Sequence, residues 1–154
     1  MIGRAEVARR RQQLDATFLR GSSLPQEPEI LSDFARYLCI LVSGYLEQSV
    51  IEILLEYTRK NSNGRVQKNV ESRLRQLTNL KTKRMIDTLG SFDSAWAKSL
   101  EVYLVDEYKD AVNSIVDLRN AISHGRYEGI TMHRMGDYYV LIKAVVDRIS
   151  QVCV

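Results

Sequence analysis

The sequence is poor in the residues that cross-link or interrupt a chain. Its 154 residues include only two cysteines, two prolines and two histidines. Cys39 and Cys153 are far apart and form no Cys-x-x-Cys pair, so we expect reduced thiols in a cytoplasmic protein rather than a disulfide scaffold. Both histidines lie far from the cysteines in the sequence, which disfavours a zinc site.

Long hydrophobic runs and the common catalytic signatures are also missing. The longest apolar run covers residues 37–42, far short of the roughly 20 residues that span a bilayer. The first residues lack the apolar stretch of a secretory signal. No Walker A, Gly-x-Gly-x-x-Gly, His-Glu-x-x-His or Gly-x-Ser-x-Gly pattern occurs. We therefore expect no cofactor, no metal, no membrane span and no catalytic triad.

What the chain does contain is helical periodicity. It is 45% hydrophobic and 27% charged, as is usual for a soluble globular domain, and its apolar residues recur at helical spacing with no alternating strand pattern. We predict an all-α bundle of six or seven helices, two of them long. The expected helices cover residues 4–20, 29–60, 66–77, 81–89, a segment capped by Asp93, 108–123, and a last one from Thr131.

The length predicts one domain spanning residues 1–154. Within it, residues 1–28 form an N-terminal helix and a proline-containing linker, and residues 29–154 form the core of the bundle. We expect Trp96, Tyr138 and Tyr139 to be packed in the core rather than to stack on bases.

The net charge of +3 hides one strongly basic stretch. Residues 59–84 carry nine basic side chains against Glu71 alone, whereas residues 21–58 and 85–154 are net acidic. Such a stretch attracts a polyanion such as RNA, although a solvated helical face explains the same charges. The candidate RNA-binding residues within it are Arg65, Lys68, Arg73, Arg75, Lys81, Lys83 and Arg84.

The best candidates for chemistry lie between residues 111 and 125. At about 100° per residue, one apolar stripe runs through this helix, and Arg119 lies about 60° from its centre. A guanidinium in that direction must reach solvent, pair with an acidic group or face a partner subunit. The stripe is formed by Ala111, Ile115, Leu118 and Ile122, and the opposite side by Asn113, Asp117, Asn120 and His124.

His124 is expected at the end of this helix, with Gly125 as the residue that terminates it. The negative end of a helix favours a protonated imidazole, which suits proton transfer near neutral pH. Arg119 offers a permanently charged, bidentate donor group for a phosphate. Asn120 can orient either the imidazole of His124 or the phosphate. Together they suffice for metal-free cleavage of RNA by its own 2′-hydroxyl. The structural alternatives are an ion pair between Arg119 and a glutamate of the long helix, and a plain capping role for His124.

The run Arg119-Asn120-Ala121-Ile122-Ser123-His124 resembles the R-N-x-x-x-H motif of the HEPN superfamily. Residues 44–49 on the long helix, the turn at 90–96, and Ile130-Thr131 before an apolar last helix are similar to its RiboL-PSP branch. The resemblance covers roughly residues 30–150.

The resemblance implies a metal-independent endoribonuclease, often a toxin or defence effector, that acts as a homodimer with Arg and His of both subunits in one cleft. Arg119 would stabilise the phosphorane and His124 would act as general acid or base, leaving a 2′,3′-cyclic phosphate and a 5′-hydroxyl. Asn120 is the polar neighbour that the motif usually carries. Glu47 matches an acidic position that pairs with or orients the motif, or it is simply structural. An antitoxin or other regulatory protein is a further expected partner.

The sequence departs from the family pattern after the motif. Toxins of this type that are neutralised by nucleotide attachment often carry R-x4-H-x-Y, whereas here Tyr127 follows His124 by three residues. Tyr127 is therefore as readily a packing residue as a modification site. Two other functions stay open: a non-catalytic HEPN module that binds RNA or nucleotide or serves as a dimerisation scaffold, and a helical interaction protein with an accidental motif.

Overall fold

The computed structural model describes residues 3–126 and 129–154, and within these ranges it contains seven helices and no strand. This confirms the predicted all-α fold with its two long helices, of 34 and 21 residues. The helices are α1 (Gly3–Gly21), α2 (Pro28–Asn61), α3 (Gly64–Leu74), α4 (Thr82–Gly90), α5 (Ser94–Tyr103), α6 (Asp106–Ser123) and α7 (Met132–Val152).

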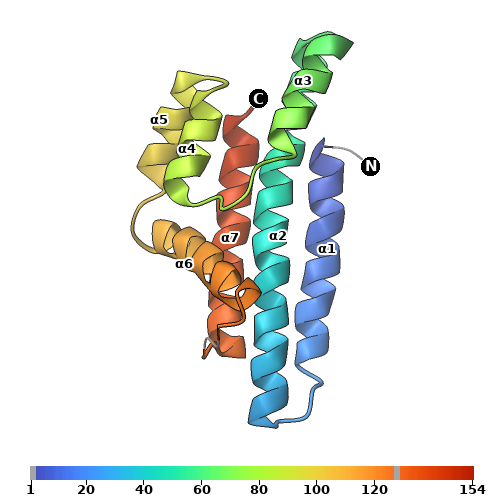
Figure 1. Ribbon diagram of the computed structural model, residues 1–154, viewed down its shortest axis with the longest axis vertical. Coiled ribbons are helices and arrows are strands. Elements are labelled where there is room, and N and C mark those ends of the chain that lie inside the picture. The colour runs from blue at the N-terminus through green and yellow to red at the C-terminus, as the bar shows by residue number, and fades with distance from the viewer. Residues whose placement is uncertain (1–2, 127–128) are drawn as a thin grey trace.

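The long helix α2 forms the centre of the bundle (Figure 1). Helices α1 and α7 lie along it, and α6 packs across α2 and α7. The short helices α4 and α5 form a pair beside α7, while α3 extends beyond the end of α2. The elements that carry the motif and the basic stretch are thus both built on α2.

Helix α2 has the sequence of a core helix. It starts with Pro28 at a position where the missing N–H is no loss, and Arg59 and Lys60 in its last turn complement the helix dipole. By length and composition it could cross a membrane, but 72% of its most apolar window is buried inside the bundle, as in the core helix of a soluble protein.

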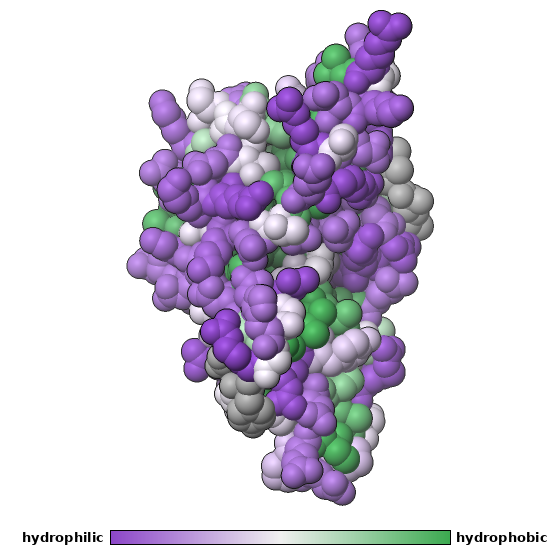
Figure 2. All heavy atoms as spheres, viewed as in Figure 1, coloured by the Kyte–Doolittle hydropathy of each residue, from purple (hydrophilic) through white to green (hydrophobic). Residues whose placement is uncertain are grey.

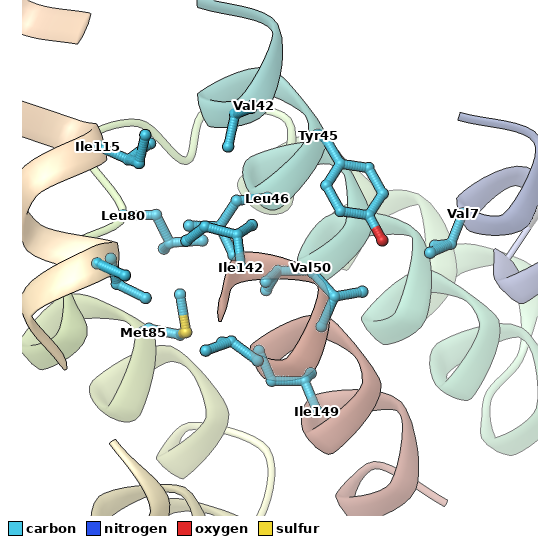
Figure 3. Packing of buried hydrophobic residues seen from close by; sticks show 14 of the residues in the cluster. Val7, Val42, Tyr45, Leu46, Val50, Leu80, Met85, Ile115, Ile142 and Ile149 are labelled. Atoms are coloured by element: carbon cyan, nitrogen blue, oxygen red, sulfur yellow. The ribbon is translucent and has the colours of Figure 1, made fainter. Parts of the chain in front are cut away.

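The hydrophobic core lies where α2, α6 and α7 meet (Figure 3). Leu46, Ile115 and Ile142 come from these three helices, and Leu80 and Met85 close the cluster from the side of α4. Each is at most 2% exposed, and burying a side chain of this size stabilises the fold by about 1.5–3 kcal/mol. Because this core fixes α6 on α2, it also fixes the segment that carries the motif.

Polar contacts attach α1 to the two long helices. Arg4 pairs with Glu56 of α2 and donates to Ser150 Oγ of α7 at 2.9 Å. About two turns further along the same face of α1, Arg11 Nε donates to Tyr45 Oη at 2.8 Å, and its Nη2 lies 2.7 Å from Asp147 Oδ1. Two arginines of α1 therefore each bridge α2 and α7.

Several local predictions are confirmed and one boundary is wrong. Asp93 and Thr131 cap α5 and α7 by accepting from backbone N–H groups, and Trp96 and Tyr139 are buried, whereas Tyr138 is half-buried. The helix expected to reach residue 77 ends at Leu74 instead. Residues 75–81 form a connection in which Asn79 takes a left-handed conformation (φ +52°), which an asparagine tolerates better than most residues.

Candidate functional site

Helix α6 buries a wider face than the predicted stripe, of which Ala111 and Ile115 are buried as expected. Leu118 and Ile122, assigned to the apolar stripe, are only half-buried, because α6 packs against α2 and α7 at once and its buried arc is wider and turned toward α2. The fully buried residues are Ala111, Val112, Ile115, Val116 and Ala121.

This shift changes where Arg119 points. Arg119 follows Val116 by three residues and Val112 by seven, so it lies on the buried face itself, one turn beyond the core. There it lines a small crevice between α2 and α6 together with Ser43, Leu46 and Glu47 of α2. Arg119 is nevertheless exposed, because the crevice opens to solvent.

The guanidinium of Arg119 has no hydrogen bond or ion pair within residues 3–126 and 129–154. The alternative interpretation, an ion pair with a glutamate of the long helix, is therefore not formed in this structure. Burial raises the pKa of both Glu47 and Cys39, and the positive charge of Arg119 opposes that rise at each of them. A free cation aimed over a crevice can receive a phosphate in bidentate geometry.

Glu47 is subject to the charges of two arginines. Its carboxyl is half-buried, and burial raises its pKa, while the charges of Arg119 and Arg84 act in the opposite direction. Arg84 comes from α4 and is far from the motif in sequence. The structure thus gathers Arg119, Glu47 and Arg84 from three helices into one electrostatic cluster.

His124 is held by a well-formed helix end. It is the C-cap of α6, and Gly125 follows in a left-handed conformation (φ +73°). Gly125 N donates to Ile122 O at 3.0 Å and Arg126 N to Ala121 O at 2.9 Å, the two bonds of a Schellman motif. The predicted role of Gly125 is confirmed, and the exposed His124 is placed by backbone geometry.

Asn120 is half-buried and lines the same crevice as Arg119. The other two polar residues of that row have structural roles. Asn113 Oδ1 accepts from the backbone N of Thr82 at 3.0 Å, and Asp117 pairs with Lys81 at 2.6 Å. Both hold the start of α4 against α6.

The sequence profile of the family described as RiboL-PSP-HEPN matches residues 5–154. This chain belongs to the RiboL-PSP-HEPN family. No curated protein and no solved structure matches it. HEPN domains are often ribonucleases and commonly bind RNA and dimerise, so membership supports an RNase-like or RNA-binding function.

The basic residues of this HEPN chain are divided between two places. Lys81 and Arg84 lie beside the motif crevice, as their effects on Asp117 and Glu47 show. Helix α3 carries Arg65, Lys68 and Arg73 at the far end of α2 (Figure 1). The basic stretch of residues 59–84 therefore does not form one continuous surface beside the motif.

Three of the seven candidate RNA-binding cations are engaged in ion pairs. Arg75 lies 3.3 Å from Glu71 and 3.6 Å from Glu52, and Lys83 lies 3.1 Å from Asp87, while Lys81 pairs with Asp117 as described above. The remaining four have no ion-pair partner in the part of the chain that the structure describes. They are Arg65, Lys68, Arg73 and Arg84.

Sequence reasoning missed a groove of about 650 Å³ in this HEPN fold, between α3, α4 and the end of α2. Its wall includes Tyr57 and Phe92, which come from segments distant in sequence. No local pattern indicates such a groove, because its lining is brought together only by packing.

The remaining points concern a metal site, Cys39 and Tyr127. Within the described ranges, no group of three His, Cys, Asp or Glu side chains is placed to hold a metal ion. Burial raises the pKa of the Cys39 thiol to about 12, so this cysteine is unreactive. Tyr127 lies outside the described residues.

Proposed function

We propose that this protein is a metal-independent endoribonuclease in which Arg119 binds the scissile phosphate and His124 transfers protons. The observation that carries the proposal is the guanidinium of Arg119 at the α2–α6 crevice, which has no partner among the described residues. It stands at the start of an R-N-x-x-x-H segment whose histidine is held by the Schellman turn. Family membership supports the same chemistry.

In the proposed reaction, the 2′-oxygen of a ribose attacks the neighbouring phosphorus. A neutral His124 imidazole accepts the 2′-hydroxyl proton as the O2′–P bond forms, and a protonated His124 gives a proton to the 5′-oxygen as the P–O5′ bond breaks. Arg119 stabilises the negative charge of the phosphorane, and Asn120 orients the phosphate or the imidazole. The products are a 2′,3′-cyclic phosphate and a 5′-hydroxyl.

A homodimer would supply both groups to one phosphate. Arg119 and His124 are five residues apart, which separates their directions by about 140° around the axis of α6. Within one chain Arg119 lies beside α2, and His124 points in a different direction. The His124 imidazole of a second subunit is therefore the simplest partner for Arg119 at one phosphate.

An exposed apolar strip on α2 supports such an interface. Tyr37 and Ile40 are 49% and 44% exposed, and Ile40 shares a helix face with Ser43 and Glu47 of the crevice. Figure 2 shows apolar atoms exposed along α2 beside the end of α6. The strip therefore adjoins the motif, as an interface that completes the site requires.

We further infer a cytoplasmic toxin or defence effector that is restrained by an antitoxin or another regulatory protein. The free, buried cysteines support a reducing compartment, and a metal-free ribonuclease in the cytoplasm would need restraint to spare its host.

The deciding experiment is RNA cleavage in EDTA by the wild-type protein and two variants. We expect His124→Ala and Arg119→Ala each to lower the cleavage rate at least about 100-fold, with unchanged circular dichroism because both side chains are exposed. The matched control Lys98→Ala, on the exposed side of α5, should cleave like the wild type.

Two results would count against the proposal. Loss of cleavage in EDTA contradicts a metal-free mechanism. RNA that stays intact with the wild type but is bound through Arg65, Lys68 and Arg73 favours the second candidate, a non-catalytic RNA-binding module. These cations of α3, which have no ion-pair partner in the described part of the chain, support that candidate.

A further inference from the structure

The groove between α3 and α4 combines an aromatic wall with two arginine side chains. Tyr57 and Phe92 line it, and their ring centroids are 6.4 Å apart in an edge-to-face arrangement. Arg73 and Arg84 also line it, and neither has an ion-pair partner in the described part of the chain. Figure 2 shows apolar atoms between α3 and α4 with hydrophilic residues on both sides.

The aromatic wall is rigid. Behind Tyr57 and Phe92 lies Trp96, which is 7% exposed and is packed edge-to-face on Tyr57 at 4.7 Å and parallel to Phe92 at 6.2 Å. Ring packing of this kind restricts the motion of both wall residues, which also line the groove. A flat, apolar ligand therefore meets a preformed surface and loses little free energy to ordering.

The position of Arg84 connects this groove with the catalytic crevice. Arg84 lines the groove and its charge also acts on Glu47, which in turn lies beside Arg119. The turns of α2 at Glu47 and Thr58 are about 16 Å apart at 1.5 Å per residue. A few nucleotides of single-stranded RNA are enough to span this distance.

We propose that the α3–α4 groove seats an unpaired base of the RNA substrate outside the scissile bond, with the base against Tyr57 and Phe92 and a phosphate at Arg73. Single-stranded RNA has both features that the groove complements, a π-face and a backbone charge at each nucleotide. Double-stranded RNA does not offer its bases in this way. This groove proposal rests on the proposed function only in taking RNA as the ligand. Binding of a base in the groove does not require that the RNA be cleaved.

The test is binding of an unstructured 12-nucleotide RNA to a protein carrying His124→Ala, so that cleavage cannot interfere. Trp96 is the only tryptophan in the chain and touches both wall residues, so its fluorescence should change saturably as the groove fills. Anisotropy of a labelled RNA gives a second, independent measure of Kd.

Three variants are compared in this background. Arg73→Glu and Tyr57→Leu should each raise the Kd about tenfold, whereas Lys98→Glu, a charge reversal on the exposed side of α5, should change it less than about twofold. Arg73→Glu should also lower the slope of log Kd against log salt by at least about 0.7, the value for one phosphate contact on a single strand. Tyr57→Leu should leave that slope unchanged, because it removes stacking and not charge.

Unchanged RNA affinity in both Arg73→Glu and Tyr57→Leu, with both proteins folded, would overturn the proposal and leave the groove to a different occupant such as a protein partner. A wild-type protein that binds the RNA in this groove without cutting any RNA would disprove the ribonuclease and leave the groove proposal intact. The two failures are therefore distinguishable.

Discussion

At the scale of single residues, the positions of Arg119 and Glu47 place two charged side chains at a crevice between packed helices. Arg119 continues the buried face of α6 past the end of the core, so a charge that belongs in solvent lies over α2. Glu47 lies beneath it and is partly withdrawn from water. The guanidinium remains available to a ligand while the carboxylate is disfavoured by burial.

Replacing Glu47 by glutamine should stabilise the protein at pH 7. Burial raises the pKa of Glu47 in the folded state, so the folded protein holds this proton more tightly than the unfolded chain. The resulting stability is present below the ordinary carboxyl pKa and is lost as the pH rises through the raised value. We therefore expect Glu47→Gln to increase the Tm at pH 7 and to change it little near pH 3.5, where both side chains are neutral.

The control for this measurement is Glu101→Gln on the exposed side of α5, which should leave the Tm unchanged at either pH. A lower Tm for Glu47→Gln at pH 7 would show that attraction to Arg119 and Arg84 outweighs the cost of burying the carboxylate.

At the scale of elements, the start of α4 depends on α6. Lys81 occupies the N-cap position of α4 without a capping hydrogen bond from its side chain. The cap is supplied instead by Asn113, whose Oδ1 accepts from Thr82 N at 3.0 Å, and Lys81 is fixed by Asp117. The two helices are therefore joined by a cap that no local sequence pattern encodes.

Asn113→Ala should lower the free energy of unfolding by about 1 kcal/mol, because it removes the acceptor and leaves a helix N–H unpaired. Asn113→Asp keeps an acceptor oxygen and places a negative charge at the positive end of α4, so it should retain wild-type stability. Urea denaturation of the three proteins at one pH measures the difference. Equal losses in both variants would mean that packing of the side chain matters rather than the cap.

At the scale of the whole molecule, the charged and apolar surfaces are arranged along α2. The apolar strip with Tyr37 and Ile40 lies on its first half, the motif crevice lies near its middle, and the α3–α4 groove adjoins its end. Pairing of two chains through the strip would bring two motifs together and leave each groove exposed at the far end. The proposed dimer and the proposed groove are thus compatible.

Ile40→Arg should prevent dimerisation and reduce RNA cleavage together. A buried arginine without a partner is strongly unfavourable in an apolar interface, and a monomer lacks the facing histidine. Light scattering after size exclusion measures the oligomeric state, and the cleavage assay is run on the same samples. Val102→Arg, at an equally apolar position on α5 that is 79% exposed, is the matched control and should stay dimeric and active.

A wild-type protein that is monomeric at micromolar concentration and fully active would contradict the proposed dimer. So would an Ile40→Arg protein that is monomeric but cleaves RNA at the wild-type rate.

The sequence determined the helical class, the approximate helices and the residues that carry the motif. These follow from local physics: apolar spacing sets the helices, Asp93 and Thr131 cap them, and Gly125 takes the left-handed conformation that ends α6. Each of these signals lies within a few residues of its effect.

Only the tertiary structure decided which face of α6 is buried, where Arg119 points and which basic residues lie near it. Packing on α2 and α7 together widened the buried arc beyond the predicted stripe, to include Val112 and Val116. It also brought Arg84 toward Glu47 and Tyr57 toward Phe92 across long intervals of sequence. The physical reason is that a helical period fixes directions around one axis, whereas the partner that occupies each direction depends on how several axes are packed together.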